Sequence, residues 1–185
     1  MTRKVIAFAG KAGSGKDYRC SVLVKNHGYV KMAFADALRR VAFATLGMDY
    51  NEGMEKYEEL KRTKIFGDLT FRNILENLGT EGIRKYDNDF WVKCLINDME
   101  KENADKDICI SDLRFVNEYD KLKKYCDERG YSFELVFCDY HSERYEEVNN
   151  HASAQLANFL KNLQYEDGEV VSDDIMQTYI TSLNG

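Results

Sequence analysis

Long apolar runs are missing from this sequence of 185 residues. No apolar stretch approaches the ~20 residues that a helix needs to span a bilayer, so we expect no membrane segment. The apolar run in "MTRKVIAFAG" is too short for a signal peptide, which favours a cytoplasmic protein. The chain also has no proline, and nothing in the sequence explains this absence.

The sequence also lacks a net positive charge and the clusters of histidine and cysteine that bind metals. The formal charge of −6 gives no support for a nucleic-acid scaffold, which usually carries a basic field. The three histidines are scattered, and none of the five cysteines lies in a C-x-x-C pair. Cys109 and Cys138 lie in apolar runs, so we expect buried, reduced thiols. We therefore expect small-molecule partners rather than a nucleic acid or a membrane, with a homodimer left open.

Short apolar stretches alternate with amphipathic ones along the chain. Asp36 is the expected N-cap of one helix, and residues 49–70 are expected to form a helix and a surface loop. Strands that alternate with helices predict one α/β domain around a parallel sheet, covering residues 1–185. The predicted strands are 4–10, 29–35, 107–111, 131–140 and 168–172. The predicted helices are 17–28, 36–47, 70–86, 89–102, 117–130, a short one after residue 153, and 173–183.

The stretch "GKAGSGKD" follows the first predicted strand and has the spacing G-x-x-x-x-G-K of a phosphate-binding loop. Its glycines allow a close backbone approach, and N–H groups of the loop and of the next helix would face the phosphates. Lys16 would bridge the β- and γ-phosphates. The alternative is a glycine turn with a surface lysine. The predicted nucleotide-binding residues are Gly10, Lys11, Ala12, Gly13, Ser14, Gly15, Lys16 and Asp17.

Asp17 departs from the usual loop, in which a Ser or Thr hydroxyl at this position binds Mg²⁺. A carboxylate is also a hard oxygen ligand that suits Mg²⁺, directly or through water. The alternative is an acidic residue in the first helical turn that interacts with the helix dipole.

Five blocks of sequence resemble the bacteriophage deoxynucleoside monophosphate kinases, a branch of the P-loop nucleotide kinase fold. They are "GKAGSGKD", "FADALRRVAFATLG", "LENLGTEGIRKYDNDFWVK", "ISDLRFVNEYDKLKKYCDERG" and "HASAQL", in this order. The resemblance implies a three-layer α/β fold with a mostly parallel sheet, helices on both faces and a small lid at about residues 139–155. It also implies transfer of the γ-phosphoryl group of ATP to a deoxynucleoside 5′-monophosphate with Mg²⁺, giving the diphosphate for DNA precursor synthesis.

The resemblance further implies where the reacting phosphates bind. Phosphoryl transfer needs positioning and charge neutralisation, and a guanidinium group binds two phosphate oxygens at once. Asp112 would assist Asp17 at the metal. The implied catalytic residues are Lys16, Arg114 and Arg144, and the implied acceptor contacts are Asp36, Arg39, Thr80, Arg84, Trp91 and Arg114.

Each of these assignments has a structural alternative. The arginines are also typical of solvated helix surfaces, Trp91 of a buried helix face, and Asp112 of a helix N-cap. The lid differs from the family pattern, because Ala154 stands where a glutamate is usual. An arginine that commonly follows the fourth strand is replaced by Asp139 or Tyr140.

Other functions remain open on the same residues. One is a different small-molecule kinase of this fold, of the dephospho-coenzyme A or phosphomevalonate type. Another is a nucleotide-binding domain without catalysis. A GTP-binding switch is disfavoured, because the sequence contains no N-K-x-D tetrapeptide to read guanine.

Overall fold

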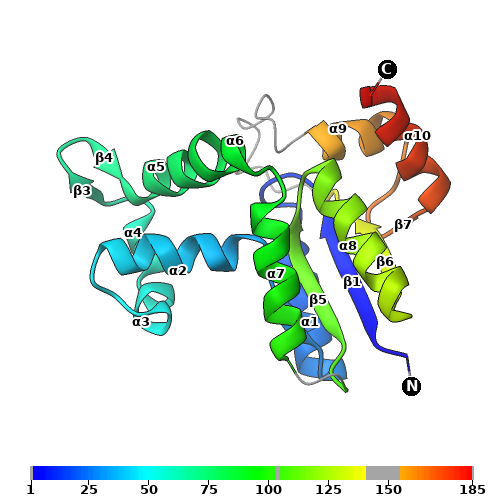
Figure 1. The fold of residues 1–185 in the computed structure, drawn as a ribbon, viewed down its shortest axis with the longest axis horizontal. Coiled ribbons are helices and arrows are strands. Elements are labelled where there is room, and N and C mark those ends of the chain that lie inside the picture. The colour runs from blue at the N-terminus through cyan, green and yellow to red at the C-terminus, as the bar shows by residue number, and fades with distance from the viewer. Residues whose placement is uncertain (1, 103–104, 141–154, 185) are drawn as a thin grey trace. The chain divides into compact units, whose positions relative to one another are not determined.

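The computed structural model describes residues 2–102, 105–140 and 155–184 (Figure 1). The chain divides into two compact units. The first unit contains the residues up to Ala33 and from Met99 on, and the second contains Phe34–Asp98. Whether the chain acts as one domain stays a prediction.

The first unit is built on a sheet with the strand order β2-β5-β1-β6-β7. The first four strands of this order run parallel, and β7 pairs with β6 in the antiparallel direction. Parallel strands buried on both faces read as continuous apolar runs, which is the pattern of "VIAFA" and "ICIS". The prediction of a mostly parallel α/β sheet is confirmed. The strands are β1 (Lys4–Ala9), β2 (Val30–Met32), β5 (Ile108–Leu113), β6 (Ser132–Phe137) and β7 (Val170–Val171).

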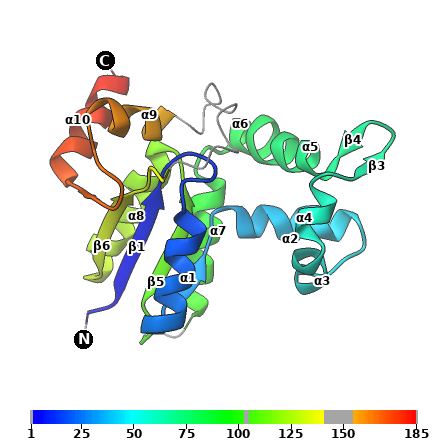
Figure 2. The same ribbon diagram turned by 180° about the vertical axis from the view of Figure 1, so that it is seen from behind.

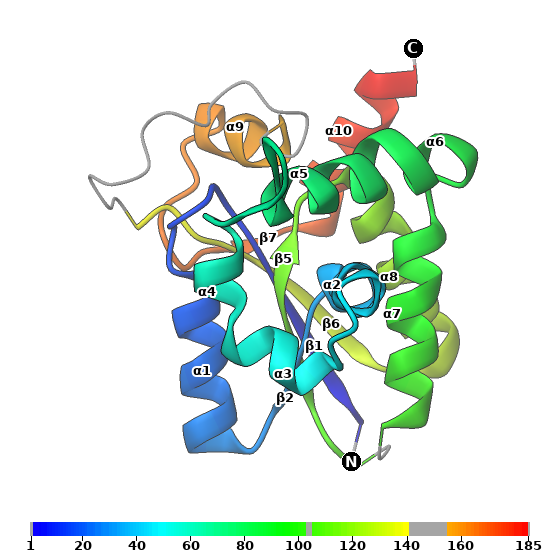
Figure 3. The same cartoon turned by 90° about the vertical axis from the view of Figure 1, so that its left-hand side faces the viewer.

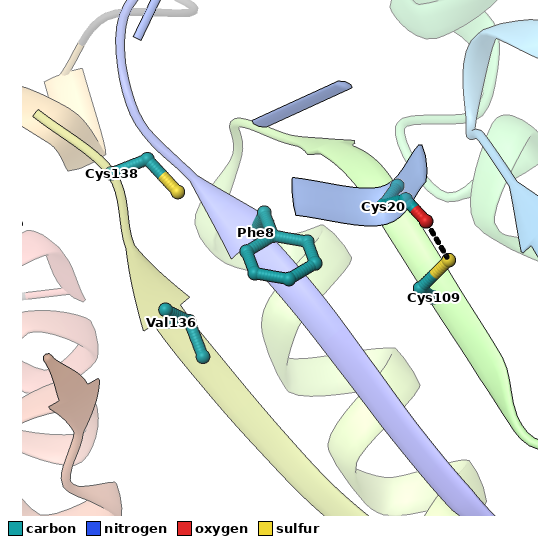
Figure 4. Packing of buried hydrophobic residues seen from close by; sticks show 5 residues of the cluster. All are labelled: Phe8, Cys20, Cys109, Val136 and Cys138. Carbon is teal, nitrogen blue, oxygen red and sulfur yellow. Dashed lines mark hydrogen bonds between the residues drawn. The ribbon is translucent and has the colours of Figure 1, made fainter. Parts of the chain in front are cut away.

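Helices flank this sheet on both faces. The helix α1 lies on one face and α8 on the other, as the opposite views of Figures 1 and 2 and the side view of Figure 3 show. On the α8 side, the rings of Tyr119 and Phe133 lie 5.7 Å apart. On the α1 side, a buried cluster lies between helix and sheet (Figure 4). The helices of this unit are α1 (Lys16–His27), α8 (Val116–Arg129), α9 (Gln155–Asn162) and α10 (Asp173–Asn184).

The second unit is mainly helical, with a hairpin of β3 (Lys64–Phe66) and β4 (Leu69–Thr70). Its core contains the stacked rings of Phe43 and Phe71, whose centroids are 5.1 Å apart. A Cβ atom at Gly53 would lie 2.3 Å from the Phe43 ring, so only glycine fits there. The remaining elements are α2 (Ala35–Thr45), α3 (Tyr50–Glu55), α4 (Tyr57–Leu60), α5 (Phe71–Glu76), the π-helix η1 (Asn77–Ile83), α6 (Arg84–Tyr86) and α7 (Phe90–Lys101), which runs on into the first unit.

Three sequence-based expectations need correction. Asp36 is not an N-cap: α2 begins at Ala35, and the Asp36 side chain binds elsewhere in the unit. Asp112 is not an N-cap either, because β5 continues to Leu113 and α8 begins only at Val116. The region 49–70 contains two short helices and a hairpin rather than one helix and a loop. In the described part of the chain, no helix is long and apolar enough to cross a membrane.

Candidate phosphate-binding site

The loop of residues 10–15 joins the end of β1 to the start of α1, as the motif predicts. Gly10, Gly13 and Gly15 have φ angles of 153°, 78° and 85°, which side chains rarely allow. A Cβ atom at Gly10 would also lie 2.2 Å from the carbonyl oxygen of Cys138. The Cys138 N–H donates to the Ala9 carbonyl at 2.8 Å, so the loop starts against the chain that follows β6. Glycine is therefore a steric requirement of this loop.

Lys16, the first residue of α1, turns its side chain back over the loop. Its Nζ donates to the Gly10 carbonyl at 2.8 Å, to the Lys11 carbonyl, and to the Ser14 Oγ at 3.2 Å. The side chain is buried, with a residue exposure of 6%. An ammonium group is thus fixed beside backbone N–H groups that begin a helix and lack intrahelical partners. This arrangement suits a multiply charged anion.

The electrostatics of Lys16 also suit an anion. Burial, together with the nearby positive charge of Arg114, lowers the pKa of Lys16 to about 8, although Cys138, Asp17 and Asp112 act in the opposite direction. A charged lysine is therefore costly here until negative charge arrives. A bound phosphate would supply that charge directly.

Asp17, in the first turn of α1, contacts two other elements of the first unit. Its Oδ1 lies 2.6 Å from Nζ of Lys31, which belongs to β2, and the Ser111 side chain on β5 is close enough to favour its ionised form. Partial burial alone would raise the pKa of Asp17. The hydrogen bond and the charge of Lys31, together with Ser111, have the larger effect, so the pKa of Asp17 is lowered overall. The carboxylate therefore stays ionised at the edge of the phosphate loop.

Arg114 follows the last residue of β5, and its backbone is held by Glu118. The buried Glu118 carboxylate accepts the N–H groups of Arg114 at 2.9 Å and of Phe115 at 3.0 Å. Both donors lie where the chain leaves the strand, before α8 begins. Glu118 therefore fixes the backbone that carries the predicted catalytic arginine.

The oxygen donors near Lys16 fit the magnesium ion that the sequence resemblance leads us to expect. Asp17 supplies a carboxylate, Ser111 a hydroxyl, and Asp112 a second carboxylate whose charge acts on Lys16. Mg²⁺ usually keeps several waters and binds one or two carboxylates together with substrate phosphates. The described residues contain no group of three His, Cys, Asp or Glu side chains that could hold a metal alone.

The second unit brings two predicted acceptor contacts together. Arg39 donates from Nη1 to Asp36 Oδ1 at 2.8 Å, and the Tyr50 hydroxyl donates to the same oxygen at 2.8 Å. The Arg39 guanidinium lies over the Tyr57 ring, 5.2 Å from its centroid. Burial, with the Asp36 charge and hydrogen bond, raises the pKa of Tyr50 to about 12. The Arg39 guanidinium is thus oriented by the Asp36 carboxylate and the Tyr57 ring.

Thr80, Arg84 and Trp91 lie in or near the π-helix of the second unit. Trp91 is buried, and its Nε1 donates to the Gly79 carbonyl at 3.2 Å. This position favours the interpretation of Trp91 as a core residue rather than a base-stacking one. Arg84 donates from Nη1 to the Asn88 carbonyl at 3.4 Å. π-Helices are rare and frequently lie at functional sites.

Sequence reasoning missed three residues of the first unit, Lys31, Ser111 and Glu118. The signals were weak: a lysine within the short strand "VKM", a serine ending "ICIS", and a glutamate two residues into the helix of the D-x-R block. Arg144 and residues 141–154 of the predicted lid lie outside the described residues.

Comparison with known proteins gave two viral relatives. A protein of Acanthamoeba polyphaga mimivirus, provisionally named deoxynucleotide monophosphate kinase, is 27% identical over an alignment of 133 residues that covers 65% of this chain and 68% of that protein. The uncharacterised protein ORF76 of Ictalurid herpesvirus 1 (strain Auburn) is 27% identical over 116 residues, 61% of this chain. That match spans only 41% of the herpesvirus protein.

Among solved structures, the APS kinase CysC Cys556Ala mutant of Mycobacterium tuberculosis aligns with 89% of this chain and 100% of its own, at a TM-score of 0.41 and 13% identity. No family model matches the chain.

Proposed function

We propose that this chain is an ATP-dependent kinase that phosphorylates a deoxynucleoside 5′-monophosphate. The observation that carries the proposal is the buried Lys16 ammonium, held over a glycine loop between a parallel strand and a helix. The similarity to the mimivirus protein supports the acceptor class.

The donor nucleotide would bind at the loop. N–H groups of the loop and of the first turn of α1 would donate to the β- and γ-phosphates. Lys16 would exchange its neutral acceptors in the loop for phosphate oxygens, which form stronger, charge-assisted hydrogen bonds. Asp17, Ser111 and Asp112 would hold Mg²⁺, which neutralises charge on the two phosphates.

Transfer would then depend on positioning and on charge. Arg114, whose backbone Glu118 fixes, would stabilise the transferring phosphoryl group. Arg39, Thr80 and Arg84 are proposed to bind the monophosphate acceptor, and Asp36 would orient Arg39 through their ion pair of 2.8 Å. A bidentate guanidinium contact would fix the acceptor phosphate more narrowly than a lysine could.

The test is a coupled assay of ADP formation from Mg·ATP with each common deoxynucleoside and ribonucleoside monophosphate. We expect at least one deoxynucleoside monophosphate to be phosphorylated. Lys16→Ala should lower kcat/KM by about a hundredfold or more, because Lys16 acts on charge that develops during transfer. Lys25→Ala, at an exposed position of the same helix, is the control and should keep full activity.

The alternatives give different results. Binding of Mg·ATP without phosphorylation of any acceptor would contradict the proposal and leave a nucleotide-binding domain. Activity of Lys16→Ala within threefold of wild type would contradict the role of the loop.

A further inference from the structure

The Asp17 carboxylate of α1 lies close to side chains of two strands of the first unit, β2 and β5. Lys31 reaches it from β2 at 2.6 Å, and the Ser111 side chain of β5 is close enough to lower its pKa. The side chains of Asp17 and Lys31 are 78% and 40% exposed, whereas Ser111 is buried. The carboxylate is therefore largely exposed, and the cation beside it is accessible to solvent and open to exchange.

Strand register explains why these residues meet. β2 and β5 are parallel neighbours, with Lys31 paired to Cys109. The Cys109 thiol faces α1, where it donates to the Cys20 carbonyl at 3.7 Å (Figure 4). Asp17 precedes Cys20 by three residues and so lies on the same face of α1. Ser111, two residues after Cys109, reaches Asp17 from the same side of the sheet.

The site differs from the usual phosphate-loop metal site at the residue that follows the loop lysine. In P-loop NTPases a hydroxyl after the loop lysine and an aspartate from a strand hold the metal. Here the helix supplies the carboxylate of Asp17 in place of that hydroxyl, in addition to the carboxylate of Asp112 on the strand β5. The Lys31 ammonium lies against the Asp17 carboxylate, where a metal ion would bind.

We propose that Lys31 is the resident counter-ion of Asp17, and that a divalent metal arriving with the nucleotide displaces it. The inference rests on the proposed function only in placing a nucleotide-bound metal at Asp17. Exposed ion pairs are weak, so displacement of Lys31 by a divalent ion is not costly.

The proposal predicts that Lys31 lowers metal affinity. Lys31→Met removes a competing positive charge from beside the metal ligand. In the presence of ADP, Mn²⁺ should therefore bind to the Lys31→Met variant about three- to tenfold more tightly than to wild type. Lys31→Arg keeps the charge and should stay within about twofold of wild type. The readout is free Mn²⁺, followed by electron paramagnetic resonance during titration.

A matched control separates local competition from net charge. Lys123 of α8 also forms an ion pair at 2.6 Å, with Asp127, so Lys123→Met removes the same charge from a similar pair. Lys123→Met should leave Mn²⁺ binding unchanged. Asp17→Asn should weaken Mn²⁺ binding and remove the effect of a second change, Lys31→Met.

Mn²⁺ binding to Lys31→Met that is equal to or weaker than binding to wild type would overturn the inference. It would also be overturned if Lys31→Met still tightened Mn²⁺ binding in a protein that already carries Asp17→Asn. Failure of the proposed function has a different signature. Wild type would then phosphorylate no monophosphate, whatever the order of Mn²⁺ affinities. Phosphorylation with no difference between Lys31→Met and wild type in Mn²⁺ affinity would refute the inference alone.

Discussion

The burial of Lys16 predicts a specific dependence of stability on pH. Below pH 8, the folded protein without nucleotide must hold a charged ammonium in a desolvated place, since burial lowers the pKa of Lys16 from 10.5 to about 8. Replacing Lys16 by methionine removes this titration while keeping much of the side-chain volume. In the difference between the two proteins across pH, the groups that do not interact with Lys16 cancel, so the titration of Lys16 dominates.

The sign follows from proton counts. Between pH 8 and 10.5, Lys16 is protonated in the unfolded chain and neutral in the folded one, so the unfolded state binds more protons. The free energy of unfolding of wild type must then rise with pH relative to that of Lys16→Met. Roughly 1.4 kcal/mol per pH unit over the interval from about 8 to 10.5 gives about 3 kcal/mol.

The assay is urea unfolding of both proteins at several values of pH from 7 to 10.5, read as the difference between their free energies. The absolute curves will include tyrosines, such as Tyr50, whose pKa of about 12 makes folded protein less stable at high pH. That contribution cancels in the difference. With saturating ADP in the wild-type samples, phosphate charge should raise the pKa of Lys16 and remove the rise.

A difference between wild type and Lys16→Met that stays flat from pH 7 to 10.5 would refute the reasoning. The ammonium would then be solvated or compensated in the free protein. Its hydrogen bonds to the Gly10 carbonyl and to Ser14 Oγ would offset the burial.

Two further predictions concern the arginines. Arg84→Ala should raise the KM of the monophosphate acceptor roughly ten- to a hundredfold, because it removes a charge-assisted contact that is made in the ground state and in the transition state alike. Calorimetry should find the affinity for ATP unchanged. Weaker ATP binding with an unchanged KM of the acceptor would contradict the assignment. Glu118→Ala leaves the N–H groups of Arg114 and Phe115 without their buried acceptor and should lower the free energy of unfolding by about 2 kcal/mol or more. Glu118→Gln keeps an acceptor oxygen and should lose less in urea unfolding; an equal loss would show that the backbone contact is not what matters.

The parts of the fold that sequence predicted are those with local causes. The parallel strands have continuous apolar runs, and α1 and α8 end at Gly28 and Gly130, both at positive φ. The glycine loop was predictable because the spacing of its glycines and lysine lies within seven consecutive residues. These features depend on neighbours in sequence, so a single sequence contains their signal.

The parts that escaped prediction depend on long-range contacts. Asp36 looks like an N-cap by position, but Arg39 and the distant Tyr50 bind its carboxylate in the second unit. The helix predicted over 70–86 contains a π-helix, and the Trp91 indole binds the Gly79 carbonyl within it. Helical periodicity does not report such a contact, because the partner lies outside the window in which the period is read.

The same distinction explains why the sequence identifies Asp17 as unusual but does not identify its partners. The motif identifies the residue after the loop lysine, but its partners come from β2 and β5, which are neighbours only through the strand order of the sheet. The sequence alone left two alternatives for Asp17, a metal ligand and an acidic residue at the helix start. The Lys31 contact at 2.6 Å joins them, because a carboxylate that already holds one cation beside the loop can exchange it for another. Metal affinity in this loop should therefore depend on a lysine that no loop motif contains.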